Sequence, residues 1–193
     1  MKKPIIVIVG PTASGKTGVA IELAEKIGGE IICADSRTIY KSMDIGTAKP
    51  GVPEQKNVVH YGLDLVEPNE RFTVYDWKKY AEQKIYEIRR LGKYPIIVGG
   101  TGLYIDALIY NYQFDQKHKS DQIDRNKMGD DFLVYGVKWT SEELRERIRL
   151  REQQMFDNEG LIAETKELVK KFDWNTQSMR SNIYQFVWRM LNK

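Results

Sequence analysis

Short apolar runs and amphipathic stretches alternate along the first part of the chain. The β-branched run 5–9, bounded by Pro4 and Gly10, predicts a strand buried on both faces of a parallel sheet. Residues 16–27 have helical spacing of apolar positions, and residues 30–34 predict a second short strand. This order of strand, loop, helix and strand is typical of an α/β protein.

The remainder of the chain predicts further elements of both kinds. Residues 36–61 are rich in glycine, proline and polar side chains without periodicity, which indicates a functional loop region with short helical turns. Helical patterns at 73–91 and 103–110 flank a strand at 95–98. A last strand is expected at 132–137, and three helices follow: one opening at 141 with Ser141 as a candidate N-cap, one at 161–172 and one at 178–191.

A phosphate-binding motif lies between the first predicted strand and the first predicted helix. The pattern is G-x-x-x-x-G-K-[ST], where glycines let the backbone wrap an anion and the helix N-terminus points its N–H groups at the phosphates. A lysine adds a mobile cation, and the final hydroxyl can bind Mg²⁺. The residues that match are Gly10, Pro11, Thr12, Ala13, Ser14, Gly15, Lys16 and Thr17.

The elements and the motif together predict an α/β fold with a P-loop NTPase-like three-layer core, a parallel sheet and additional C-terminal helices. With 193 residues, one domain spanning 1–193 is expected. The polar stretch 111–131 is interpreted as a linker, and residues 141–193 as a helical part packed on the core.

Composition narrows the class of protein only modestly. Hydrophobic residues at 41% and charged residues at 30% are ordinary for a globular chain, and a net charge of +3 permits nucleic-acid binding without indicating it. No apolar stretch is long enough to span a membrane, and the single cysteine, Cys33, cannot form an internal disulfide. We therefore expect a cytoplasmic protein with no membrane association.

Asp35 is the first candidate for chemistry outside the P-loop, because it follows an apolar strand. Its carboxylate could organise Mg²⁺ as in ATPases and kinases, act as a general base, or simply cap a turn. The residues alone leave these three interpretations open.

Four motifs in one order give the chain a resemblance to a known family. They are the P-loop, Ala34-Asp35-Ser36-Arg37, the segment Asp44-Ile45-Gly46-Thr47-Ala48-Lys49-Pro50, and Val98-Gly99-Gly100-Thr101-Gly102-Leu103-Tyr104. A looser patch contains Arg147-Ile148, Arg151, Met155 and Gly160-Leu161. In order and spacing these segments resemble the tRNA dimethylallyltransferase (tRNA isopentenyltransferase) family.

The resemblance implies a reaction and roles for individual residues. The family transfers a dimethylallyl group from dimethylallyl diphosphate to N6 of adenosine 37, next to the anticodon of tRNA, with Mg²⁺. It implies Asp35 as general base, Thr101 beside the reacting groups and Arg151 as a second pyrophosphate clamp. Thr17 would bind the metal. The expected tRNA contacts are Asp35, Ser36, Arg37, Thr38 and Thr101.

The chain also departs from the family pattern. Family members usually carry a helical insertion where only residues 111–131 stand here, so an adenine nucleotide (AMP, ADP or ATP) remains an alternative acceptor. A P-loop kinase and an inactive RNA-binding remnant are further alternatives. The arginines at 145–151 are interleaved with glutamates, so part of that helix could be an ordinary solvated face. His60 and Tyr61 are not expected to form a zinc site, and a monomer is expected.

Overall fold

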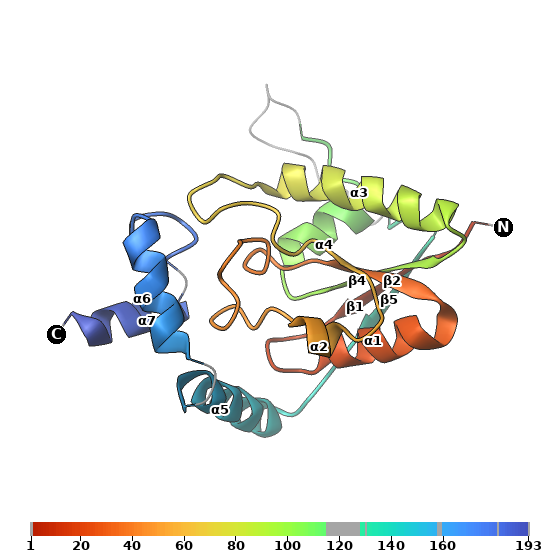
Figure 1. Cartoon of the computed structure of the whole chain (residues 1–193). Helices are drawn as coiled ribbons and strands as arrows, with labels where there is room; N and C mark the ends of the chain where they lie inside the picture. Colours follow the sequence, from red (N-terminus) through yellow and green to blue (C-terminus); the bar gives the residue numbers. More distant parts are fainter. Residues whose placement is uncertain (1, 115–127, 130, 158–159, 181, 193) are drawn as a thin grey trace. The chain divides into compact units, whose positions relative to one another are not determined.

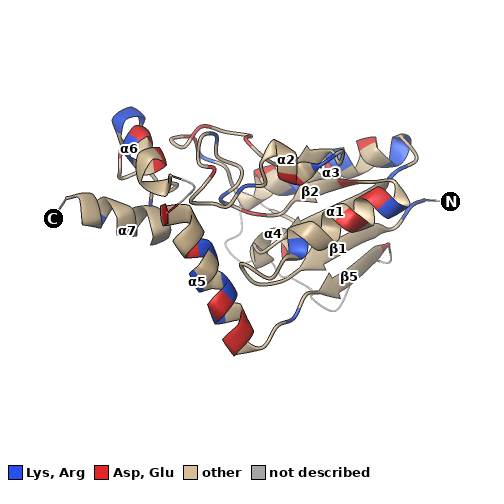
Figure 2. Ribbon diagram, turned by 60° about the horizontal axis from the view of Figure 1, so that its bottom comes forward, with Lys and Arg blue, Asp and Glu red and all other residues tan. Residues whose placement is uncertain are grey.

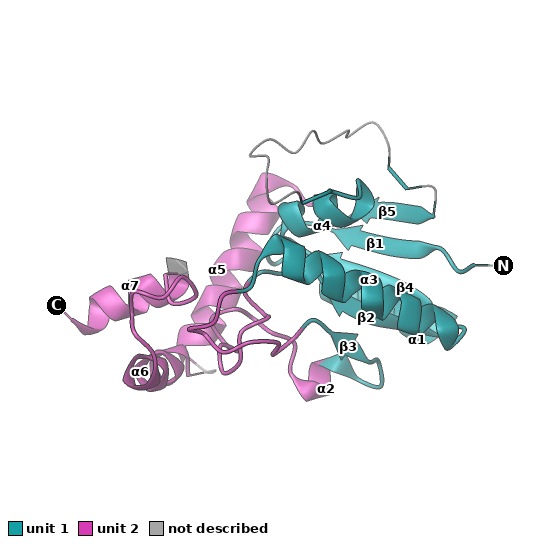
Figure 3. Ribbon diagram, turned by 90° about the horizontal axis from the view of Figure 1, so that it is seen from above, with its two compact units in different colours: residues 1–36, 55–62, 72–138 teal, residues 37–54, 63–71, 139–193 magenta. Residues whose placement is uncertain are grey.

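The computed structural model describes residues 2–114, 128–129, 131–157, 160–180 and 182–192. The chain divides into two compact units, each assembled from several segments and shown in two colours in Figure 3. Unit 1 contains Met1–Ser36, Gln55–Gly62 and Phe72–Lys138, and unit 2 contains Arg37–Glu54, Leu63–Arg71 and Trp139–Lys193. The single domain expected over 1–193, with C-terminal helices packed on its core, stays a prediction.

Unit 1 is built on a parallel sheet in the order β3-β2-β4-β1-β5. The strands are β1 (Ile5–Val9), β2 (Gly29–Cys33), β3 (His60–Tyr61), β4 (Tyr94–Gly99) and β5 (Phe132–Gly136). Every paired strand runs parallel to its neighbour. The α/β class and the parallel sheet expected from the sequence are confirmed. β3 was not predicted, because two residues are too few to display a strand period.

Among the described residues of unit 1, three helices cover the sheet. Figure 1 shows α3 (Val74–Arg90) and α4 (Gly102–Ile109) on one face and α1 (Lys16–Ile27) on the other. α1 buries one stripe, formed by Ala20, Ile21 and Ala24. Helix, sheet and helix layers thus form the predicted three-layer core.

A hydrophobic cluster lies between the sheet and the α3 and α4 pair. Trp77 of α3 is fully buried and stacks on Tyr104 of α4, with ring centroids 4.8 Å apart. Its indole Nε1 donates a hydrogen bond of 3.0 Å to the carbonyl oxygen of Cys33. Burying this ring removes a large apolar area from water and fixes α3 against the end of β2.

Helix ends in unit 1 follow local capping chemistry. Thr73 precedes α3 and forms a reciprocal capping box with Asp76. α1 ends at Ile27, and its C-cap Gly28 has a positive φ of 68° and donates its N–H to the Ala24 carbonyl oxygen. These two signals explain why the helices predicted at 73–91 and 16–27 agree closely with the observed bounds.

Unit 2 contains the C-terminal helices α5 (Ser141–Asp157), α6 (Leu161–Lys171) and α7 (Asn182–Leu191). A one-turn helix, α2 (Val52–Gln55), lies where the chain passes between the units. α6 buries side chains spaced three and four residues apart, which are Leu161, Thr165 and Leu168. α7 buries Tyr184 and Val187 on one face. Both helices were predicted from the sequence, and the buried stripe of each is the amphipathic pattern of a helix packed on one face.

Two local predictions in unit 2 were wrong. Ser141 is not the N-cap of α5; the Thr140 hydroxyl accepts from the Glu143 N–H at 3.3 Å, and the Glu143 carboxylate accepts from the Thr140 N–H at 3.0 Å. The capping box therefore starts one residue earlier. α7 begins at Asn182 and not at 178: residues 178–180 form a turn, in which the buried Ser178 hydroxyl donates to the Pro68 carbonyl at 2.6 Å.

The predicted linker 111–131 lies mostly outside the described residues, which include only 111–114, 128–129 and 131 of it. Within the described part of the chain, no helix combines the length and apolar character needed to cross a membrane.

The Cys33 thiol gives a first test of this packing. Burial, and secondarily the negative charge of Asp35, raise the pKa of this thiol to about 12. A raised thiol pKa keeps the neutral form at pH 8, so a thiol-specific disulfide reagent should react on the order of 10³ times more slowly with native than with urea-unfolded protein. Absorbance of the released thiolate measures both rates. Equal rates would contradict the buried position of Cys33.

Candidate active site

The carboxyl ends of β1, β2 and β4 meet at one edge of the sheet in unit 1. Val9 of β1 pairs with Gly99 of β4, and Cys33 of β2 pairs with Val98 of the same strand. The residues that directly follow these three strands must therefore lie close together. The P-loop follows β1, Asp35 follows β2 and Thr101 follows β4, so the fold gathers three of the predicted elements at one edge.

The P-loop has the backbone of an anion site. Ala13 and Gly15 adopt positive φ angles of 62° and 83°, and Gly15 caps α1 without any side chain. Gly15 has no side chain to cap the helix, and the positive end of the helix dipole lies at the loop. The Lys16 ammonium donates to the Pro11 carbonyl oxygen at 3.3 Å, which folds the cation over the loop.

Glycines let the strand ends approach each other at backbone distance. A Cβ atom at Gly99 would overlap the backbone carbonyl of Ala34, so only glycine fits there. A Cβ atom at Gly100 would lie 3.8 Å from the Lys16 ammonium nitrogen, which places the loop after β4 beside the P-loop lysine. Gly99 and Gly100 thus allow the loop after β4 to pack directly against the end of β2 and the P-loop lysine.

Thr101 fastens the segment that carries Asp35. Its hydroxyl oxygen accepts from the Ser36 N–H at 2.9 Å and donates to the Ser36 hydroxyl at 3.3 Å. Its own N–H donates to the Ala34 carbonyl oxygen at 3.1 Å. Asp35 is therefore held between two residues that Thr101 contacts, and it is partly exposed. The sequence did not predict the Ser36 contact, because 65 residues separate the partners.

The other predicted site residues belong to unit 2. Arg37 donates from its guanidinium to the Gln177 carbonyl oxygen at 3.4 Å. Thr38 is 6% exposed, and within the described part of the chain its hydroxyl has no hydrogen-bond partner. Arg151 lies on α5 and is partly buried. The tRNA contacts of Arg37 and Thr38 and the phosphate contact of Arg151 stay predictions.

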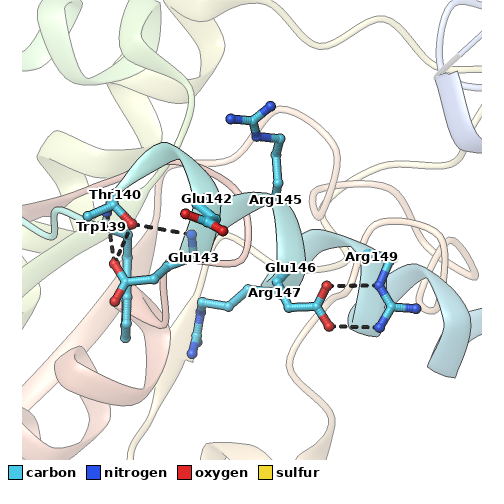
Figure 4. A pocket seen from close by; sticks show the side chains of 8 residues that line it. All are labelled: Trp139, Thr140, Glu142, Glu143, Arg145, Glu146, Arg147 and Arg149. Carbon is cyan, nitrogen blue, oxygen red and sulfur yellow. Dashed lines mark hydrogen bonds and ion pairs between the residues drawn. The ribbon is translucent and has the colours of Figure 1, made fainter.

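The arginine-rich face of α5 is largely occupied by local pairs. Figure 4 shows Arg149 forming two bonds to the Glu146 carboxylate, at 2.7 and 2.9 Å, and Figure 2 shows both charge signs interleaved along the helix. This contact lowers the pKa of the Glu146 carboxyl, and the same pairing raises that of the Arg149 guanidinium. The Arg147 guanidinium lies over the Trp139 ring, 4.4 Å from its centroid. These contacts resemble those of a solvated helix face.

Comparison with known proteins assigns the chain to a family. Its sequence matches the model described as "IPP transferase" over residues 38–129 and 116–193, and the one described as "Isopentenyl transferase" over residues 3–63. The chain belongs to the IPP transferase family. The resemblance inferred from the motifs is thereby confirmed.

Individual relatives support this assignment. A Staphylococcus epidermidis protein named tRNA dimethylallyltransferase is 53% identical over 122 residues, covering 63% of this chain and 37% of the relative. An Acetivibrio thermocellus protein of the same name is 45% identical over 152 residues, covering 76% and 49%. The chain thus spans about a third to a half of the length of these curated family members.

A solved structure confirms the fold. The crystal structure of tRNA delta(2)-isopentenylpyrophosphate transferase from Staphylococcus epidermidis superposes with a TM-score of 0.87 at 32% identity. The match covers 98% of this chain and 81% of that structure. The P-loop NTPase-like α/β fold predicted from the sequence is therefore that of the IPP transferase family.

The approach of Gly99 to Ala34 gives a stability test. Replacing Gly99 by alanine should lower the free energy of unfolding by about 3 kcal/mol or more, because backbone, not a flexible side chain, must move to admit the methyl group. Gly18→Ala is the matched control: a Cβ at this exposed α1 position meets nothing within 4 Å and should stabilise by roughly 0.5–1 kcal/mol. Urea unfolding measures both; similar midpoints would show that the strand ends are not tightly joined.

Proposed function

We propose that this protein transfers a dimethylallyl group from dimethylallyl diphosphate to N6 of adenosine 37 in the anticodon loop of tRNA. The observation that carries the proposal is the shared strand edge, where Lys16 lies beside Gly100 and Thr101 holds the segment containing Asp35. A phosphate-binding loop and a carboxylate thus lie at the same edge of the sheet, where they could act on one substrate. Membership of the IPP transferase family, whose relatives bear the name tRNA dimethylallyltransferase, supports the same chemistry.

The donor half of the reaction falls to the P-loop. Its backbone N–H groups and the N-terminus of α1 would hold the diphosphate, with the Lys16 ammonium neutralising its charge. As the bond between the allylic carbon and oxygen breaks, the electron pair leaves with pyrophosphate and negative charge grows there. The proposed second cation, Arg151, would stabilise that charge.

The acceptor half falls to Asp35 and its neighbours. N6 of the adenine attacks the allylic carbon and forms the new carbon–nitrogen bond while pyrophosphate departs. The Asp35 carboxylate takes the proton that N6 loses, and Thr101 fixes its position through Ser36. An adenine stacked in an anticodon loop must first leave its stack, at a cost of a few kcal/mol. Ser36, Arg37 and Thr38 would contact the displaced nucleotide.

Mg²⁺ fits this site as a partner of the diphosphate. No group of three or more His, Cys, Asp or Glu side chains that could hold a metal ion occurs among the residues that the structure describes. Mg²⁺ commonly takes most of its ligands from phosphates and water, with few from protein. Thr17, in the first turn of α1 beside Lys16, would supply a hydroxyl ligand. Bound Mg²⁺ would neutralise part of the pyrophosphate charge. A cytoplasmic location and a monomeric state stay predictions from the sequence.

Asp35→Asn tests the proposal directly. Protein with Mg²⁺ and radiolabelled dimethylallyl diphosphate should label unmodified tRNA, and Asp35→Asn should lower kcat about 10²–10⁴-fold by removing the base without changing its shape. The control Asp157→Asn, at an exposed position ending α5, should keep full activity. Scintillation counting of precipitated RNA measures transfer.

Separate reactions with AMP and ATP as acceptors distinguish the alternatives. Label entering only these nucleotides would identify an adenine nucleotide prenyltransferase. No label in any acceptor, together with phosphoryl transfer from ATP, would replace the prenyl-transfer proposal by a kinase.

A further inference from the structure

The segment Asp44–Pro50 is a family motif to which no role has yet been given. It lies in unit 2 and forms no helix or strand, and Ala48 within it adopts a positive φ of 49°. A segment of turns needs outside contacts to hold one conformation, because it lacks a ladder of its own. Two charged side chains provide these contacts.

The first contact is a carboxylate that collects backbone donors. Glu164, in the first turn of α6, accepts from the N–H groups of Asp44 at 3.0 Å and Ile45 at 2.8 Å on one oxygen. Its other oxygen accepts from the Gly46 N–H at 3.0 Å and from the Tyr184 hydroxyl at 2.5 Å. Bonds to a charged acceptor are stronger than neutral ones, so Glu164 clamps the first three residues of the motif.

Tyr184 completes this clamp from α7. Its side chain is fully buried, and burial together with the negative charge of Glu164 raises the pKa of its hydroxyl, which therefore stays a donor. A Cβ atom at Gly46 would lie 2.5 Å from the Tyr184 ring. The glycine of the motif is thus required by the tyrosine that packs on it.

The second contact is a buried cation inside the motif. The Lys49 side chain is 5% exposed, and its ammonium donates to the Tyr40 carbonyl at 2.7 Å. It also donates to the carboxylates of Asp44 and Asp64, both at 2.6 Å. All three ammonium hydrogens can be used, and the lysine joins segments on both sides of the motif.

This clamped segment continues directly from the proposed RNA contacts. The Thr38 carbonyl accepts from the Asp64 N–H at 3.3 Å, and Asp64 in turn binds Lys49. The Ile39 carbonyl accepts from the Leu65 N–H at 2.7 Å. The backbone of residues 38–40 is therefore linked to the segment Asp44–Pro50 through Asp64 and Lys49.

We infer that Glu164 is a positioning residue for acceptor recognition: by clamping Asp44–Gly46 it holds the segment from Arg37 to Tyr40 in the conformation that receives the adenine nucleotide. The inference rests on the proposed function. It assigns Glu164 no contact with substrate. Its removal should therefore weaken use of the RNA acceptor while leaving the P-loop and the diphosphate untouched.

Glu164→Gln tests the inference, because glutamine keeps the shape but turns one accepting oxygen into a donating amide. KM for an anticodon stem-loop RNA with unmodified adenosine 37 should rise about tenfold or more, while KM for dimethylallyl diphosphate stays within about twofold. At saturating RNA, kcat should stay within about threefold of the wild type. The matched control is Glu167→Gln on the same helix, whose exposed carboxylate pairs only with Lys170 among the described residues and should change neither KM.

Tyr184→Phe is a milder second variant, which still tests the inference if Glu164→Gln does not fold. It removes one donor to Glu164 and keeps the ring, so a smaller rise of RNA KM, about two- to threefold, is expected. Hydrogen exchange should also quicken at the amides of Asp44, Ile45 and Gly46 in Glu164→Gln. Faster exchange with unchanged RNA KM would overturn the inference and leave Glu164 a purely structural residue, and an equal rise of donor KM would overturn it as well.

A protein that lacks the proposed transferase activity would give a result different from failure of this inference. If the wild type transfers no label, equilibrium binding of the same stem-loop RNA to wild type and Glu164→Gln still decides the inference. A dissociation constant about tenfold higher in the variant supports it, and equal constants overturn it.

Discussion

β4 forms parallel ladders with β1 on one side and with β2 on the other, and this alignment determines where the groups of the candidate site in unit 1 lie. Because parallel strands end at the same edge, the residues that follow them meet without any further constraint. Gly99 then allows backbone contact with Ala34, and Thr101 binds Ser36. The site is thus a consequence of strand register, refined by one glycine and one hydroxyl.

Features that depend on local chemistry were predictable from the sequence. The run from Ile5 to Val9 is short, β-branched and uninterrupted, which favoured a buried strand, and Gly28 caps α1 where the sequence predicted the helix to stop. Motif order sufficed to indicate the family and its P-loop fold. Thr140, by contrast, competes with Ser141 for the cap of α5, and two neighbouring hydroxyl residues cannot be ranked from sequence.

Features that depend on long-range contacts were not predictable. The sequence marks Thr101 as part of a motif but does not reveal its bond to Ser36. In the same way it marks Gly46 and Lys49, while the partners Glu164 and Asp64 lie in other segments of unit 2. A motif made of turns has no helical or strand periodicity in its sequence. Its conformation can be understood only once the side chains that bind it are known.

Cys33 has a practical consequence for spectroscopy. Its side chain is buried at the end of β2, and the chain contains no other cysteine. A cysteine introduced at an exposed position, such as Glu167→Cys on α6, would therefore be the one thiol that a fluorescent or spin label modifies in the folded protein. Such a variant can be labelled at a chosen point while Cys33 stays in place in the core, and RNA binding can be followed by the signal of a single probe.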